Sequence, residues 1–199
     1  MREVGREELL SLGAYEEIRA HFRARMIERK KRRRLSLGEH MTLIFENHDT
    51  VLFQVQEMLR TERITSEPEI AHELLTYNAM VPGANELFAT LMIEYSDPDE
   101  RHRALDALND VEGKLVLHLG DARCAAEFQR LPGEEASRLP AVNYLRFRLP
   151  EDAAQSMKDA SMDASLEVTH PHYQAEQALP KATRVELSAD LDESLSRRP

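Results

Sequence analysis

The sequence of 199 residues has one cysteine, no tryptophan and only seven glycines. The single cysteine, Cys124, excludes an intrachain disulfide, a zinc site built from several cysteines and an iron–sulfur cluster held by this chain alone. A glycine-rich phosphate loop is implausible with so few glycines, and the sequence lacks G-x-x-x-x-G-K-[ST], G-x-G-x-x-G and G-x-S-x-G. The familiar nucleotide-binding and hydrolase motifs are therefore absent.

Long hydrophobic runs are absent as well. No apolar stretch approaches the ~20 residues that a membrane-spanning helix needs, and the first eight residues show no apolar signal core. We therefore expect a cytoplasmic protein without a membrane partner. Aromatic residues make up only 6% of the chain, so its 42% of hydrophobic residues must build the core from Leu, Val, Ile, Met and Ala.

Charge is distributed unevenly on a chain of net charge −10. Residues 1–35 hold 11 Lys and Arg against 6 Asp and Glu, whereas the remainder holds 15 against 30. A basic first segment on an acidic body indicates either an anionic partner or docking of the segment on the body itself.

The hydrophobic patterns predict an α+β fold, with one domain over residues 1–199 and a mixed or mostly antiparallel sheet covered by helices. A long basic helix is expected within residues 1–35, and residues 196–199 are expected to fray. Residues 41–45, 87–95 and 142–147 should be the best-formed strands, all in one sheet. The full set of expected helices is 6–12, 15–34, 50–63, 66–77, 97–108, 151–161 and part of 180–195. The full set of expected strands is 35–46, 86–95, 114–119, 125–129, 142–149 and 165–168.

Three stretches resemble a bacterial family of unknown function, DUF3501. They are AHFRAR at 20–25 with KKRRR at 30–34, LIFEN at 43–47 with DTV at 49–51 and FQVQEMLR at 53–60, and TLMIEY at 90–95. Weaker similarity lies at 144–149 and 170–173. The resemblance implies a bacterial intracellular protein, with gene neighbours that encode rubrerythrin-like and iron–sulfur proteins and hence a redox or oxidative-stress role. It implies no catalytic residue.

A polar segment that begins at the end of a strand is the first candidate site. It continues into a helix on which residues three and four apart share a face. A polar network beside an apolar stripe can hold a ligand, but it can also be an ordinary solvated face. The predicted ligand-binding residues are Glu46, Asp49, Gln54, Gln56, Glu57 and Arg60.

A basic run is the second candidate, as an anion-binding site. Consecutive cations can bind phosphates of RNA, DNA or a small ligand. Yet the run leads directly into a strand, so that some of its members must face the protein and pair with acidic side chains. The run consists of Lys30, Lys31, Arg32, Arg33 and Arg34.

Metal ligation has weaker support. Glu69 and His72 form one Glu-x-x-His on a predicted helix, whereas di-iron bundles use that motif twice. His170 and His172 could ligate a metal in a turn, with His48 or His118. Surface and turn histidines explain the same pattern, so no metal site is predicted.

We expect an accessory or binding protein that recognises a protein partner or a small ligand. A small metal-binding protein or enzyme with carboxylate and His ligands is the second reading, and a nucleic-acid-binding protein that uses residues 23–34 is the third. Catalytic residues, cofactors and oligomeric state stay open.

Overall fold

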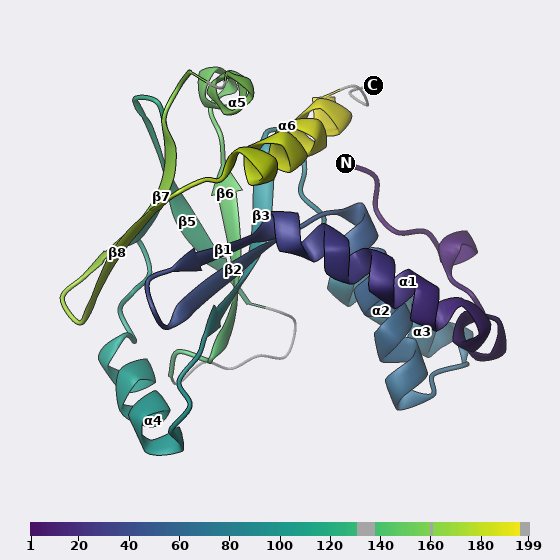
Figure 1. Ribbon diagram of the computed structural model, residues 1–199. Coiled ribbons are helices and arrows are strands. Elements are labelled where there is room, and N and C mark those ends of the chain that lie inside the picture. Colours follow the sequence, from purple (N-terminus) through teal and green to yellow (C-terminus); the bar gives the residue numbers. More distant parts are fainter. Residues whose placement is uncertain (131–137, 160, 196–199) are drawn as a thin grey trace.

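An antiparallel sheet of eight strands forms the centre of the protein in the computed structural model, which describes residues 1–130, 138–159 and 161–195 (Figure 1). Its spatial order is β1-β2-β3-β6-β5-β4-β7-β8. The strands are β1 (Arg34–Leu37), β2 (Met41–Glu46), β3 (Glu86–Ile93), β4 (Leu115–Leu119), β5 (Ala122–Gln129), β6 (Val142–Arg148), β7 (Ala164–His170) and β8 (Tyr173–Ala178).

Helices pack around the sheet in three groups (Figure 1). The first group stands to one side of β1–β3, the second lies across one end of the sheet, and a single helix lies at the other end. The first group is the short 3-10 helix η1 (Arg6–Glu8) with α1 (Leu12–Arg33), α2 (His48–Glu62) and α3 (Glu67–Asn78). The others are α5 (Glu151–Lys158) with α6 (Lys181–Leu195), and α4 (Pro98–Ala107) alone.

The predicted α+β fold is confirmed, and the sheet is antiparallel throughout its described pairs. The three segments expected as the best strands become β2, β3 and β6, which are neighbours. Leu43 lies opposite Leu91, and Ala89 lies opposite both Phe45 and Leu145. Their inward side chains are fully buried, because alternate residues of a strand point to the same face.

Two hydrophobic clusters divide the interior. The larger fills the inside of the curved sheet. The smaller lies between the outer face of β3 and helices α2 and α3; Phe88 of β3 is its buried sheet residue, and half-buried Tyr144 of β6 packs against it. Val4 and Leu9 bring the N-terminal segment into this second cluster. The N-terminal segment is thereby held against α2 and α3.

The sheet curves so far that its edge strands approach each other. The Tyr173 hydroxyl, from β8, donates to the carbonyl of Leu37 in β1 at 2.7 Å and accepts from the His40 N–H at 3.0 Å. Gly38 in the β1–β2 turn has φ 71°, and a Cβ there would lie 2.5 Å from the Tyr173 hydroxyl oxygen. Glycine therefore fits both the backbone conformation and the close approach.

Several boundaries differ from those expected. Residues 35–46 form the hairpin of β1 and β2 rather than one strand, because Gly38 takes a left-handed turn. The helix expected over 6–12 is only η1, and Gly13 lies inside the first turn of α1 instead of ending a helix. The helix expected from residue 50 starts at His48, and Asn47 caps it, with its side-chain oxygen accepting from the Thr50 N–H.

α1 begins after Ser11, whose hydroxyl accepts from the Ala14 N–H, and its last turn contains Lys30, Lys31, Arg32 and Arg33. Cations at this end complement the partial negative charge of the helix C-terminus. None of the described helices combines the length and the apolar character required to span a membrane. The tail at 196–199, expected to fray, lies outside the described residues.

Candidate ligand groove

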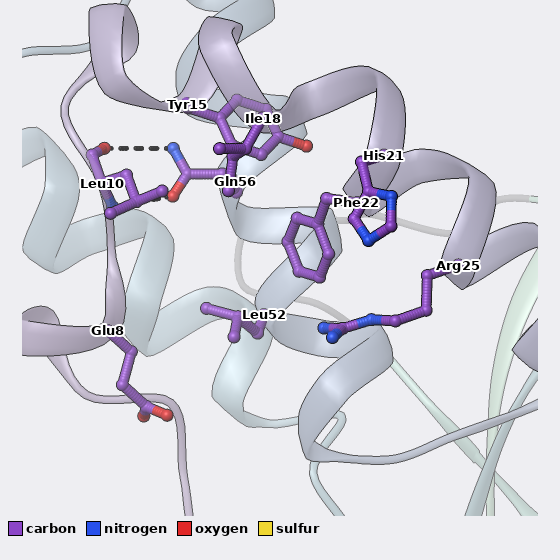
Figure 2. Close-up of a pocket in the computed structure, with 9 residues that line it drawn as sticks. All are labelled: Glu8, Leu10, Tyr15, Ile18, His21, Phe22, Arg25, Leu52 and Gln56. Atoms are coloured by element: carbon purple, nitrogen blue, oxygen red, sulfur yellow. Dashed lines mark hydrogen bonds between the residues drawn. The ribbon is translucent and has the colours of Figure 1, made fainter.

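A groove of about 250 Å³ lies between α1, α2 and the segment that joins η1 to α1. Tyr15, Ile18 and Phe22 line it from α1, Leu52 lines it from α2, and Leu10 closes one side (Figure 2). The volume is just below the roughly 300–1,000 Å³ of typical small-molecule pockets. The groove therefore has room for a small ligand that stays partly exposed.

Helical spacing explains why α1 supplies an apolar wall. Tyr15, Ile18 and Phe22 are three and four residues apart, so they lie on one face of the helix. Tyr15 is completely buried and Phe22 is half-buried, but Ile18 stays 46% exposed. Leu10, on the opposite side, is 40% exposed. Two exposed aliphatic side chains beside one groove are an apolar surface that a ligand could cover.

Gln56 fixes the distance between the two sides of the groove. Its amide oxygen accepts from the Leu10 N–H at 2.9 Å, and its amide nitrogen donates to the Leu10 carbonyl at 3.1 Å (Figure 2). The Gln56 side chain is buried, so both polar ends need these partners. Gln56 thus ties the chain before α1 to α2 and holds the groove open at a constant width.

The ring of Phe22 is positioned by its neighbours. It stands edge-to-face against Tyr15 at 6.2 Å and against Phe53 of α2 at 5.6 Å between ring centroids. The Arg25 guanidinium lies over the same ring, 5.2 Å from its centroid. Edge-to-face pairs add to the stability gained from burial. Phe22 is therefore a rigid part of the groove rather than a mobile surface residue.

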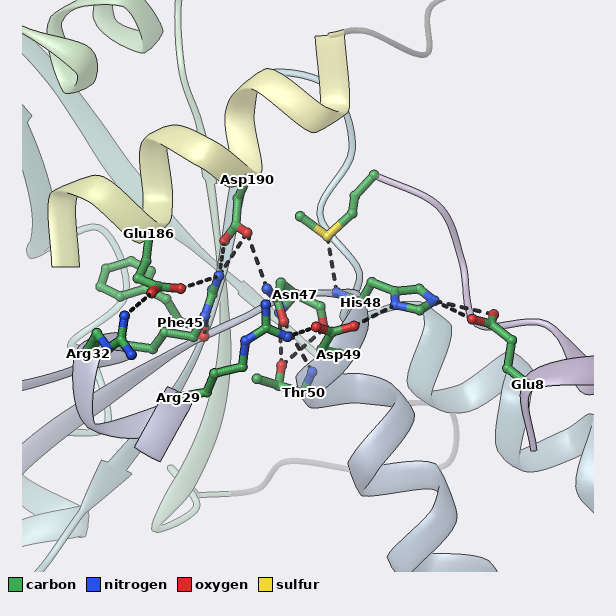
Figure 3. Close-up of polar contacts among 12 residues, drawn as sticks. Glu8, Arg29, Arg32, Phe45, Asn47, His48, Asp49, Thr50, Glu186 and Asp190 are labelled. Atoms are coloured by element: carbon green, nitrogen blue, oxygen red, sulfur yellow. Dashed lines mark hydrogen bonds and ion pairs between the residues drawn. The ribbon is translucent and has the colours of Figure 1, made fainter. Parts of the chain in front are cut away.

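Glu8 carries the acidic charge of the groove, and that charge is neutralised. Its carboxylate pairs with Arg2 and lies 3.1 Å from His48 Nε2. Burial raises the pKa of Glu8, but hydrogen bonds from the Gly5 N–H and His48 outweigh it, so the pKa lies below its usual value. Glu8 is thus an anion paired with Arg2 and His48, and Figure 3 shows its contact with His48.

Glu57 and Arg60, two of the predicted ligand-binding residues, join α2 to α1. The Glu57 carboxylate accepts two hydrogen bonds from Arg19, at 2.8 and 2.7 Å, and one from the Tyr15 hydroxyl at 2.7 Å. Arg60 makes a two-pronged pair with Glu16 at 2.6 and 3.0 Å. The direct partners of both residues thus lie on α1, and none of these hydrogen bonds joins Glu57 to Arg60.

The remaining members of that predicted set lie apart from one another. Glu46 is buried in β2, where one carboxylate oxygen accepts from the Thr90 hydroxyl at 2.8 Å and the other has no partner among the described residues. Asp49 pairs with Arg29 of α1, and half-buried Gln54 lies beside Tyr77 of α3. Gln56 is the one member of the set that lines the groove in the described residues.

The predicted anion-binding run is largely paired inside the protein. Arg33 is 1% exposed and binds Asp190 of α6 through two contacts of 2.7 Å. Arg32 lies 3.2 Å from Glu186, also on α6, and Arg34 lies 3.7 Å from Glu94. Lys31 pairs with Glu28 on α1 itself, and Lys30, the first residue of the run, is half-buried.

A buried polar hub surrounds Asp190 at the junction of α1, α2 and α6 (Figure 3). The Asn47 amide donates to Asp190 at 3.2 Å, and Arg33 also donates to the Phe45 carbonyl at 3.4 Å. Burial raises the pKa of Asp190 above its usual value, while Arg33 and Asn47 oppose this shift. The hub thus joins the helices to the end of β2.

Three of the histidines considered as metal ligands are buried or half-buried: His48, His118 and His170. Each of them already lies beside a carboxylate. His118 Nε2 lies 2.8 Å from Glu167, and His48 lies beside Glu8 and Asp49. His170 is buried: its Nδ1 accepts from the His172 N–H at 3.1 Å, so its Nε2 carries the proton given to Asp110 at 2.7 Å. No group of three His, Cys, Asp or Glu suited to a metal occurs in the described residues.

The groove is equipped for binding rather than for proton transfer. Burial and the hydrogen bond to Glu57 raise the pKa of Tyr15, so its hydroxyl stays protonated. Both polar ends of Gln56 are occupied by Leu10. The lone thiol, Cys124, is buried far along the chain in β5, where burial raises its pKa. The groove walls consequently present apolar surface and one charged end.

The sequence predicts a helix over 15–34, which contains Ile18 and Phe22, but it does not mark either residue as part of a site. Leu10 was assigned to a first helix, and Arg25 and His21 fell within a stretch of family resemblance. Nothing in the local sequence distinguishes Ile18 from the buried members of its face. The groove arises because the segment before α1 crosses to α2 and leaves Ile18 uncovered.

Comparison with known proteins places this architecture among proteins without a described activity. The family model "Protein of unknown function (DUF3501)" matches residues 3–191. A crystal structure of a novel protein of unknown function from Burkholderia pseudomallei K96243 is 35% identical, covers 96% of this chain and 100% of its own, and has a TM-score of 0.89. No curated protein sequence matches the chain. These descriptions name no activity, and the expected redox link has no support.

Proposed function

The chain belongs to the DUF3501 family of proteins of unknown function, and we propose that it is a binding protein that holds a small, largely apolar ligand in the groove between α1 and α2. The observation that carries the proposal is the pair of exposed aliphatic side chains, Leu10 and Ile18, on either side of a groove with a rigid aromatic wall. Covering them would remove apolar surface from water, which favours binding.

The walls of the groove are preformed. Arg19 and Tyr15 bind Glu57 on one side of the α1–α2 joint, and Gln56 holds Leu10 on the other. A ligand would therefore cost little conformational entropy in the protein on binding. In this proposal Gln56 borders the ligand, while Glu57 and Arg60 fix the angle between the helices that contain the lining residues.

A neutral fluorescent probe tests the proposal. N-phenylnaphthylamine should brighten when it binds the protein, and Ile18→Glu should weaken its binding, because a carboxylate would then stand in the apolar groove. The matched control is Ile27→Glu, which alters an equally exposed isoleucine of α1, 42% exposed, away from the groove.

Equal loss of probe binding in both variants, or no binding to the native protein, would contradict the proposal. A melting curve of each variant establishes that it is folded. Both isoleucines are exposed, so we expect each variant to melt within a few degrees of the native protein.

A further inference from the structure

The charges that border the groove do not cancel. Glu8 is paired with Arg2 and His48. Arg25 lines the opposite end and has no carboxylate partner in the described part of the chain, 1–130, 138–159 and 161–195. His21, one turn before Arg25 on α1, likewise has no acidic partner among these residues. The groove therefore combines an apolar wall with one uncompensated cationic end.

The Arg25 side chain is held in a position from which it can bind an anion in the groove. Its guanidinium lies 5.2 Å from the centroid of the Phe22 ring, and the side chain extends toward Leu52 across the end of the groove (Figure 2). Contact with an aromatic face holds a guanidinium in place while its N–H groups stay available. Less side-chain entropy would then be lost when those groups bind an anion.

We propose that the groove recognises a small organic anion, a carboxylate or sulfonate whose apolar body packs on Phe22 and Leu52 and whose charged group binds Arg25. This rests on the proposed function, because it assigns a ligand class to the same groove. A carboxylate fits the planar fork of a guanidinium in a two-pronged pair. His21 supplies a further N–H donor from the same side of α1.

The pairing of the neighbouring cations favours a ligand with one charge over a nucleic acid. Nucleic-acid binding requires several cations that can each neutralise a phosphate. On α1, Arg19 is committed to Glu57, Arg29 to Asp49 and Arg33 to Asp190. Arg25 is the unpaired arginine that borders the groove, so a single anionic group matches what the site offers.

Two fluorescent probes with the same aromatic rings, one neutral and one with a sulfonate, separate the effect of the ligand's charge from the effect of the apolar groove. Anilinonaphthalene sulfonate is N-phenylnaphthylamine with a sulfonate added. On the native protein the sulfonate probe should bind about two- to fivefold more tightly, the factor that an ion pair with an exposed arginine is worth. Arg25→Gln should abolish this preference, so that the two probes bind the variant with about equal affinity.

Arg23→Gln is the matched control, since Arg23 is an exposed arginine two residues earlier on α1 that does not line the groove. It should keep the preference. Added salt offers a measurement without mutation: it should weaken the sulfonate probe and spare the neutral one. Melting curves verify that the variants are folded.

The outcomes separate the two proposals. Binding of the neutral probe without any preference for the sulfonate would overturn the anion assignment and leave the groove as a binding site. An equal loss of the preference for the sulfonate probe in Arg23→Gln and Arg25→Gln would also overturn it, because the anion would then respond only to the overall charge of α1. Failure of both probes to bind would overturn the groove itself.

Discussion

At the scale of single residues, neighbouring cations of one run have different roles. Arg33 is buried and bonded twice to Asp190, while Arg32 is 59% exposed and meets Glu186 at the surface. Both contacts reach α6, more than 150 positions further along the chain. The sequence placed these residues in one anion-binding run, because local sequence contains no signal for which cation turns inward. Anion binding by this run remains a prediction.

We predict that Arg33→Ala lowers the free energy of unfolding by about 3–5 kcal/mol, because it leaves Asp190 buried without its cation. Arg32→Ala should cost less than about 1 kcal/mol, as expected for an exposed ion pair. Urea denaturation of the two variants measures both values. Similar losses for the two neighbours would contradict the buried role of Arg33.

Glu57 couples α1 and α2 through charge. Hydrogen bonds from Arg19, and then from Tyr15, lower the pKa of Glu57 below its usual value of 4.5, against the opposing effect of burial. A carboxyl whose pKa is lower in the folded state stabilises the protein above the unfolded pKa, and this contribution is lost as pH falls through the folded value.

We therefore predict that Glu57→Gln lowers the melting temperature at neutral pH and that the deficit shrinks as pH falls below about 4.5. Thermal melts from pH 7 to pH 3 give the difference directly. Glu17→Gln, at an exposed position of α1, should follow the native curve. A deficit in Glu57→Gln that stayed constant across this range would show that the carboxylate charge is not what matters.

At the scale of elements, strands with strong apolar alternation were predictable and weak edge strands were not. Residues of β3 and β6 alternate between the core and the opposite face, and their pattern is visible in the sequence. β8 has the sequence YQAEQA and is mostly exposed. Its conformation comes from pairing with β7, the strand just before it, and from the contact of Tyr173 with the β1–β2 hairpin, which is distant in sequence.

We predict that Tyr173→Phe destabilises the protein by about 1 kcal/mol, because the Leu37 carbonyl and the His40 N–H lose their partner. Amide hydrogen exchange at His40 should become faster. Tyr95→Phe is the control: Tyr95 stacks on the His40 ring at 3.8 Å, and the stack survives loss of the hydroxyl. Unchanged exchange at His40 in Tyr173→Phe would mean that the hydroxyl does not join the two edges.

At the scale of the whole molecule, the hydrophobic patterns predicted the fold class but not the groove. The mixture of helix and strand patterns indicated an α+β fold, and the structure has this form. The groove depends on three segments that meet only after folding: the chain around Leu10, the exposed side of α1 and the Leu52 face of α2. Local sequence patterns do not predict which segments come into contact in the folded protein.

The uneven charge of the chain also finds a physical explanation at this scale. The acidic body supplies Asp49, Glu57, Glu186 and Asp190 as partners for the basic segment. Docking of the segment on the body, one of the two alternatives raised by the composition, accounts for most of these cations. Arg25, which borders the groove, is left without such a partner in the described residues.

The most direct test of the account is a crystal structure of the protein with anilinonaphthalene sulfonate. We predict that the aromatic rings lie against Phe22 and Leu52 and that the sulfonate lies within hydrogen-bonding distance of the Arg25 guanidinium. Density for the probe at another surface, or a groove filled by a second copy of the chain while the probe is absent, would contradict it.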